Sequence, residues 1–207
     1  MSNINVFYRN VFVHVPKTAG VSMEVHSYIG GTGHSTFHQL TLEEKFDPDY
    51  FKWAFVRNPY DRLASAYFYL NHKKPEIAEK IVDPEKNFKS FIHNLEHSLP
   101  SDCYDETIPV DDDKYAMHIY PQLHFLKSQN HELDFIGRVE NLKEDWKTVI
   151  DNIRQRSGNH SISWKGLHHK NRTFDRRGAY IELYTPEMKN IVYDIYKEDF
   201  ITFNYSK

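Results

Sequence analysis

The fold is decided by the stretch Val11-Phe-Val-His-Val-Pro-Lys-Thr-Ala-Gly-Val-Ser22, in which an apolar run passes directly into a turn of small residues. Residues 11–15 are short, apolar and β-branched, which predicts a buried strand. Pro16 to Gly20 ends that strand, and residues 21–29 can continue as a helix. A strand, a tight turn and a helix in succession form the basic unit of a parallel sheet.

The rest of the chain repeats this alternation. Residues 52–56 and 134–139 are further apolar runs that predict strands. Helical spacing follows over 61–70, 88–95 and 142–157, and Asn141 with Glu144 predicts a capping box at the start of the last of these. Thr185 and Pro186 predict the N-terminus of the final helix. We therefore expect an α/β fold: a three-layer domain with a central parallel sheet flanked by helices, spanning residues 1–207 as a single domain.

Composition narrows the classes of function. The 207 residues carry a formal net charge of -3, so the whole molecule is not a basic nucleic-acid binder, and any anion site must be local. The single cysteine, Cys103, excludes an intrachain disulfide and fits a reducing compartment. No apolar run of 18 residues and no signal peptide are seen, so we expect a cytoplasmic protein without stable membrane insertion.

The turn after the first strand has the chemistry of an anion site. A helix N-terminus offers unpaired N–H groups, Ala19 and Gly20 allow close approach of the backbone, and Lys17 adds a positive charge. The hydroxyls of Thr18 and Ser22 add donors. The order differs from the Walker A motif, because the lysine precedes the glycine. An ordinary strand-to-helix turn is the alternative.

A second candidate anion site follows the next strand. Arg57 lies at its carboxyl end, and Ser65 lies in an early turn of the following helix. A guanidinium can hold a phosphate through two parallel N–H bonds. Ligands of open α/β sheets bind at these strand ends. Two such turns in succession suit a nucleotide with phosphates at two separate positions, although a surface salt bridge would also explain Arg57.

Both segments resemble the paired signatures by which sulfotransferases bind 3'-phosphoadenosine-5'-phosphosulfate (PAPS). Residues 14–22 are similar to the family's 5'-phosphosulfate loop, and residues 55–67 are similar to its 3'-phosphate site. The resemblance is closest to carbohydrate sulfotransferases and their small bacterial relatives, and it is weakest over 71–113, which we expect to be a variable substrate-side region. It implies a P-loop-like domain and transfer of a sulfuryl group from PAPS to a hydroxyl, with a carbohydrate as acceptor. Val21 departs from the family, which usually has a hydroxyl residue there.

A histidine base is the expected partner of the acceptor hydroxyl. His34 lies in the glycine-rich loop at the position where the resemblance implies this base, and it is favoured over His38. Lys17 is expected to neutralise the leaving oxygen of adenosine 3',5'-bisphosphate (PAP). The weaker candidates for substrate contact are His38, His118, Arg138 and Glu140. The basic loop over 165–177 either binds the 3'-phosphate or an acidic glycan, or is a solvated surface.

No metal is expected, because no histidines have a convincing zinc spacing and no obvious pair of metal-binding carboxylates is present. The main alternative is a nucleotide-dependent phosphotransferase on a P-loop-type scaffold, against which the missing Walker A order and the Arg57/Ser65 pair both count. A binding module without catalysis would retain Arg57 and Ser65 but tolerate loss of Lys17 and His34.

Overall fold

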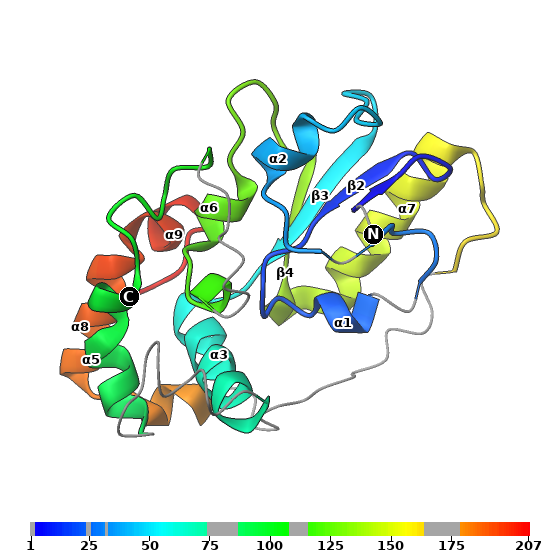
Figure 1. The fold of residues 1–207 in the computed structure, drawn as a ribbon. Helices are drawn as coiled ribbons and strands as arrows, with labels where there is room; N and C mark the ends of the chain where they lie inside the picture. The colour runs from blue at the N-terminus through cyan, green and yellow to red at the C-terminus, as the bar shows by residue number, and fades with distance from the viewer. Residues whose placement is uncertain (1–2, 24–25, 32, 74–86, 108–115, 164–178) are drawn as a thin grey trace. The chain divides into compact units, whose positions relative to one another are not determined.

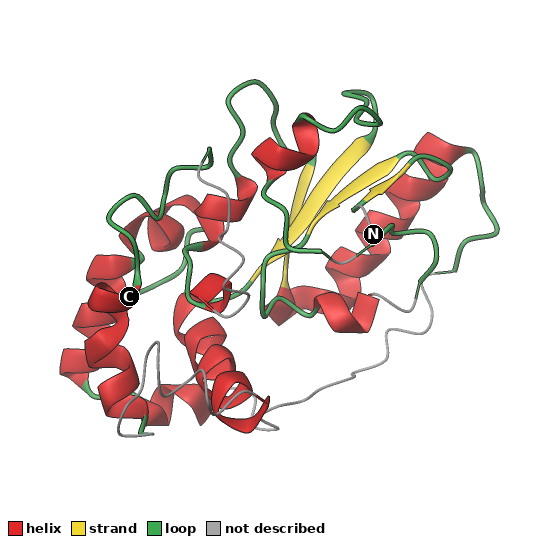
Figure 2. Ribbon diagram, viewed as in Figure 1, coloured by secondary structure: helices red, strands yellow, loops and turns green. Residues whose placement is uncertain are grey.

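The structure, a computed structural model, describes residues 3–23, 26–31, 33–73, 87–107, 116–163 and 179–207. The chain forms two compact units. Unit 1 comprises Met1–Val56, Asp105–Pro109 and Gln122–Asn171, and unit 2 comprises Arg57–Tyr104, Val110–Pro121 and Arg172–Lys207. Figure 2 shows that the strands belong to unit 1, whereas unit 2 is helical in its described part. A single domain over 1–207 stays a prediction.

Unit 1 is built on a mostly parallel sheet, which confirms the predicted α/β class. Its strands lie side by side in chain order: β1 (Ile4–Asn5), β2 (Asn10–Val13), β3 (Phe51–Val56) and β4 (Phe135–Arg138). β2 and β4 each pair with β3 in parallel, with Val13 opposite Ala54 and Val56 opposite Arg138. β1, which we did not predict, pairs with β2 antiparallel. The carboxyl ends of β2 and β3 therefore lie at one edge of the sheet.

Both faces of this sheet are covered. Every residue of β3 is buried, as expected for a central parallel strand. On one face, Phe12, Trp53 and Phe55 pack against helix α7 (Leu142–Ser157) through Trp146 and Val149. Figure 1 shows α7 on one side of the sheet and α2 (Phe37–Thr41) and α6 (Gln122–Leu126) on the other. The predicted flanking of the sheet by helices is confirmed.

The ends of α7 agree only partly with the sequence prediction. Asn141 precedes the helix but makes no side-chain cap hydrogen bond, so the predicted capping box with Glu144 is wrong. The carboxylate of Asp145 makes the hydrogen bonds at this end of the helix. It accepts one from the N–H of Arg138 at 2.6 Å and one from the side-chain amide of Asn141 at 2.8 Å. At the other end Gly158, at φ 70°, closes the helix in the left-handed conformation, directly after the predicted range 142–157.

Unit 2 has its own helical core. Its helices are α3 (Pro59–Lys73), α5 (Phe88–Ser98), α8 (Pro186–Ile195) and α9 (Lys197–Thr202), with the short 3-10 helices η1 (Ala116–His118) and η3 (Ala179–Leu183). α3 contacts η3, and α8 packs against α5. Thr185 caps α8 by accepting the N–H of Met188, and Pro186 occupies the first turn, as predicted.

A buried arginine crosses the core of unit 2. Arg62 of α3 is 1% exposed, and its Nη2 donates to the carbonyl of Tyr120 at 2.7 Å. Burial lowers the pKa of Arg62, and the charge of the fully buried Asp199 on α9 opposes that shift. This arginine joins α3 to the segment after η1.

Candidate active site

The loop after β2 has a strained backbone. Lys17 and Ala19 both adopt left-handed φ angles, 70° and 67°, although neither is glycine. Such residues cost of order 1–3 kcal/mol each and cluster at ligand sites. Thr18 between them is fully buried, and its hydroxyl donates to the carbonyl of Val15 at 2.8 Å. That hydroxyl, which we expected to donate to an anion, serves the main chain here. Alternating backbone conformations of this kind can point successive N–H groups to one side and form an anion-binding concavity.

The helix after this loop is shorter than predicted. α1 spans only Gly20–Met23, whereas we expected a helix over 21–29. Residues 24–25 lie outside the described chain, and His26 and Ile29 make turn-type hydrogen bonds. Val21 and Ser22 lie within α1, and Ser22 is buried, with its N–H bonded to the carbonyl of Ala19 at 2.9 Å.

Gly20 has a structural role that the sequence did not reveal. A Cβ at this position would lie 1.9 Å from Nε2 of His14. The His14 ring is 5% exposed and is stacked on Phe12, with 5.3 Å between the ring centroids. A histidine ring occupies the place of a side chain at Gly20, which is a reason for glycine here in addition to the expected close approach of an oxyanion.

His34 is fixed from two directions. Its Nδ1 lies 3.1 Å from the carbonyl oxygen of His14, and the two imidazole rings are 4.3 Å apart with an angle of 36° between them. The preceding loop is held by Asn3, whose side-chain amide donates to the carbonyl of Gly33 at 2.8 Å. A carbonyl can only accept, so Nδ1 of His34 carries the proton, and the lone pair of the neutral ring lies on Nε2. This is the tautomer of a base that acts through Nε2.

We had expected His38 to lie in the glycine-rich loop with His34, but it lies in a helix. It belongs to α2, whose start is a capping box between Thr36 and Gln39. The carbonyl of His38 accepts the hydroxyl of Thr41 at 2.7 Å, within the helix. The pattern Thr-x-x-Gln was the available signal for this helix.

The second candidate site lies at the start of α3 in unit 2. Arg57 makes a two-pronged ion pair with Asp61: Nε to Oδ2 at 2.7 Å and Nη2 to Oδ1 at 2.8 Å. The exposed fractions of the two side chains are 22% and 23%. Asp61 and Ser65 are four residues apart on α3 and so lie on one helix face. The salt bridge that we considered as an alternative for Arg57 is thus present, and sequence reasoning missed Asp61 as the partner of Arg57.

The weaker candidates are dispersed. His118 is buried in unit 2, with its ring 4.7 Å from that of Tyr69. Arg138, at the end of β4, is half-buried, and Glu140 is exposed. The basic loop over 165–177, with His168 and His169, lies outside the described residues.

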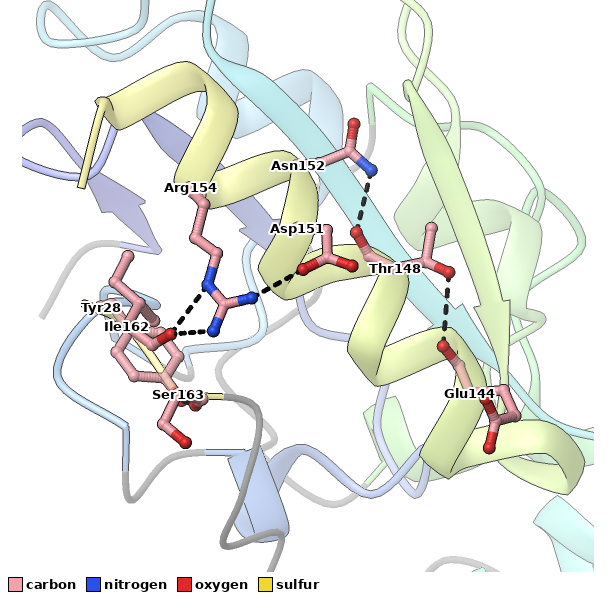
Figure 3. A network of polar contacts seen from close by, with 8 residues as sticks. All are labelled: Tyr28, Glu144, Thr148, Asp151, Asn152, Arg154, Ile162 and Ser163. Atoms are coloured by element: carbon pink, nitrogen blue, oxygen red, sulfur yellow. Dashed lines mark hydrogen bonds and ion pairs between the residues drawn. The ribbon is translucent and has the colours of Figure 1, made fainter. Parts of the chain in front are cut away.

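The chain leading into this basic loop is anchored on unit 1, as Figure 3 shows. Arg154 of α7 donates from Nε to the carbonyl of Ile162 at 2.8 Å, and its Nη2 donates to the same oxygen. Its Nη1 bonds to Asp151 at 2.8 Å. The hydroxyl of Tyr28 donates to the carbonyl of Ser163 at 2.8 Å, and burial raises the pKa of Tyr28 to about 12. These contacts fix the carbonyls of residues 162 and 163.

Two features are absent from the described residues. These residues contain no group of three or more histidine, cysteine or acidic side chains that could hold a metal ion. None of their helices combines the length and the apolar character needed to cross a membrane.

Comparison with known proteins gives one match. The model of the sulfotransferase family matches residues 3–206, nearly the whole chain. No curated protein and no solved structure matches it. Because the family match includes the loop after β2, the segment with His34 and the start of α3, we conclude that this chain belongs to the sulfotransferase family and is an enzyme of sulfuryl transfer.

Proposed function

We propose that the protein transfers a sulfuryl group from PAPS to a hydroxyl of a carbohydrate, with His34 as the base. The observation that carries this proposal is the backbone of residues 17–19, in which two left-handed residues bracket a buried threonine directly after β2. Strain of this kind persists where a loop is shaped for a ligand. A sulfotransferase needs an anion site for its donor, and the family match, which includes this loop, supports the proposal that the loop is that site.

Residues 17–22 are proposed to hold the 5'-phosphosulfate. The ligand groups would be the main-chain N–H groups of Lys17, Thr18, Ala19, Gly20 and Val21, together with the Ser22 hydroxyl and the Lys17 ammonium group. Bound in this way, PAPS supplies an electrophilic sulfur and a phosphate leaving group. The Lys17 charge would offset the negative charge that grows on the phosphate oxygen as PAP departs.

Arg57 and Ser65 are proposed to hold the 3'-phosphate. Asp61 engages Nε and Nη2 of Arg57 at 2.7 and 2.8 Å, so two of the five N–H donors of this guanidinium are directed to a carboxylate. The pair fixes the plane of the guanidinium. A phosphate bound there would meet an oriented arginine, and the Ser65 hydroxyl, on the same face of α3 as Asp61, would add a donor.

His34 is proposed to accept the proton of the acceptor hydroxyl at Nε2. The resulting imidazolium would keep its Nδ1–H bond to the carbonyl of His14, which is favourable for a cation. The acceptor oxygen then bonds to sulfur as the bond from sulfur to the phosphate oxygen breaks. This chemistry calls for no metal, since Lys17 and the loop N–H groups provide the electrostatic stabilisation.

The acceptor is proposed to be a carbohydrate, bound with help from His38, His118, Arg138 and Glu140 and from the region 71–113. Loops and connecting segments are where specificity usually varies on a shared scaffold. The cytoplasm is the proposed location, which the single cysteine supports.

The test is calorimetric titration of the full chain with PAP, and with ATP and GTP without and with magnesium. We expect metal-independent binding of PAP and no binding of ATP. Arg57→Ala should weaken PAP binding by at least tenfold, whereas Arg156→Ala, an exposed arginine on α7, is the matched control and should not. Preferential, magnesium-dependent binding of ATP or GTP would overturn the donor assignment in favour of a phosphotransferase.

A further inference from the structure

The side chain of His14 is enclosed by contacts with three other residues. Its ring contacts the Phe12 ring on the strand, with 5.3 Å between centroids and 20° between planes. It contacts the His34 ring at 4.3 Å. It fills the place of a side chain at Gly20, the first residue of α1. One buried imidazole thus connects β2, the donor loop and the proposed base.

The main chain of His14 makes the complementary contact. Its carbonyl accepts Nδ1–H of His34 at 3.1 Å. This hydrogen bond defines the tautomer of His34, while the ring contact defines the plane of the His34 ring. A histidine that must accept a proton at Nε2 needs both, because tautomer and ring direction decide where its lone pair points.

We propose that His14 is a positioning residue that holds His34 with Nδ1 protonated and Nε2 as the proton acceptor. This inference rests on the proposed role of His34 as the base. The His14 side chain does not touch the reacting atoms in this assignment; it prevents the His34 ring from turning away from the carbonyl. When His34 gains a proton, the new cation lies 4.3 Å from the His14 ring, so the role requires His14 to stay neutral.

The same contacts link the donor loop to the base. A movement of Gly20 toward the His14 ring would displace that ring, because the ring already occupies the place where a Cβ of residue 20 would lie. The His14 ring in turn is in contact with His34. Binding of the donor at residues 17–22 and the direction of His34 are therefore mechanically coupled through a single side chain.

The test is the tautomer of His34, read from the ring ¹⁵N shifts of uniformly labelled protein above pH 8, with His34→Ala used to assign the signal. The Nδ1–H form should dominate in the wild type. His14→Ala should move His34 toward the Nε2–H form, and His14→Phe, which keeps an aromatic ring, should restore the wild-type signal. An unchanged Nδ1–H signal in His14→Ala would overturn the inference.

A double variant separates the effect of His14 on the orientation of His34 from its effect on core packing. His14→Ala/Gly20→Ala places a methyl group in the vacated space, so it should recover stability while the His34 tautomer stays altered. With an acceptor identified by screening against PAPS, kcat should fall at least tenfold in both alanine variants. The Kd for PAP should change less than threefold in the single variant His14→Ala, which leaves residues 17–22 intact. If the double variant regains the wild-type tautomer and turnover together with stability, the role of His14 is only structural.

The role of His34 as the base can be refuted independently of the role of His14. Normal turnover of His34→Ala would remove His34 from the chemistry but would leave the tautomer result intact. Loss of turnover in His34→Ala with full turnover in His14→Ala would keep the base and discard the positioning residue.

Discussion

Replacing Gly20 with alanine should destabilise unit 1, and prior removal of the His14 ring should abolish that effect. The new Cβ would lie 1.9 Å from Nε2 of His14 and 2.4 Å from two of its ring carbons. Optimal contact between such atoms is ~3.5 Å, so the ring must move by roughly 1.6 Å. Phe12 and His34 are in contact with the ring and oppose this movement.

The expected magnitude follows from overpacking. Forcing one extra carbon into a well-packed core costs about 1–3 kcal/mol. Without the His14 ring the clash disappears, and at the first residue of α1 the preference of helix interiors for alanine adds little. The effect of Gly20→Ala should therefore be about 1–3 kcal/mol more favourable in the His14→Ala background, which is outside simple additivity.

The assay is urea unfolding followed by tryptophan fluorescence. Trp53 and Trp146 are buried in unit 1, and the segments that form unit 2 contain no tryptophan, so the signal reports on unit 1. Gly158→Ala is the matched control: it has no atom within 4 Å of the new Cβ but a φ of 70°. It should cost about 1 kcal/mol whichever residue occupies position 14. Equal costs of Gly20→Ala in both backgrounds would refute the reasoning.

Three further predictions concern other parts of the chain. Arg62→Met should lower the free energy of unfolding by about 3–5 kcal/mol, because it leaves Asp199 as a buried charge without this arginine. Urea unfolding followed by circular dichroism measures this change, and a loss below about 1 kcal/mol would contradict the role of Arg62 in compensating Asp199. Burial raises the pKa of Cys103 to about 11, so at pH 8 its alkylation should be over tenfold slower than that of a free thiol. The alkylation rate should increase as the pH approaches 11, and an ordinary rate with a plateau near pH 9 would contradict the burial of this thiol. Thr185→Ala should lower the free energy of unfolding by about 1 kcal/mol, since the cap on the N–H of Met188 is lost, whereas Thr148→Ala, on the exposed face of α7, should have a much smaller effect.

Much of the fold could be predicted because its signals are local. The three parallel strands are short apolar runs, and the buried stripe of α7 repeats at helical spacing. The N-cap at Thr185 and the closing glycine of α7 are also local features. By contrast, β1 has only two residues, and its pairing with Val11 and Asn10 depends on the strand already being in place.

The details of the site depended on contacts between distant residues. The position of the His14 ring against Gly20 and His34 is tertiary, so no spacing rule reveals it. Two other predictions were wrong because neighbouring polar residues can make the same capping hydrogen bonds at a helix start. Asp145, not Glu144, bonds the groups at the start of α7, and Thr36 with Gln39 makes a helix of what looked like loop. The Arg57–Asp61 pair has the spacing i, i+4 and could have been predicted.

The order of the strands in the sheet has a consequence for synthesis of the chain. Because the spatial order follows the chain order, the sheet can grow at one edge as the polypeptide leaves the ribosome. β3 is complete at residue 56, but β4, its neighbour on the other side, is made much later. Phe135 of β4 pairs with Trp53 of β3, which lies 82 residues earlier in the chain. Until then the apolar β3 has an open edge. Nascent chains that stall between residues 56 and 135 should therefore be the forms most prone to aggregate and most dependent on chaperones.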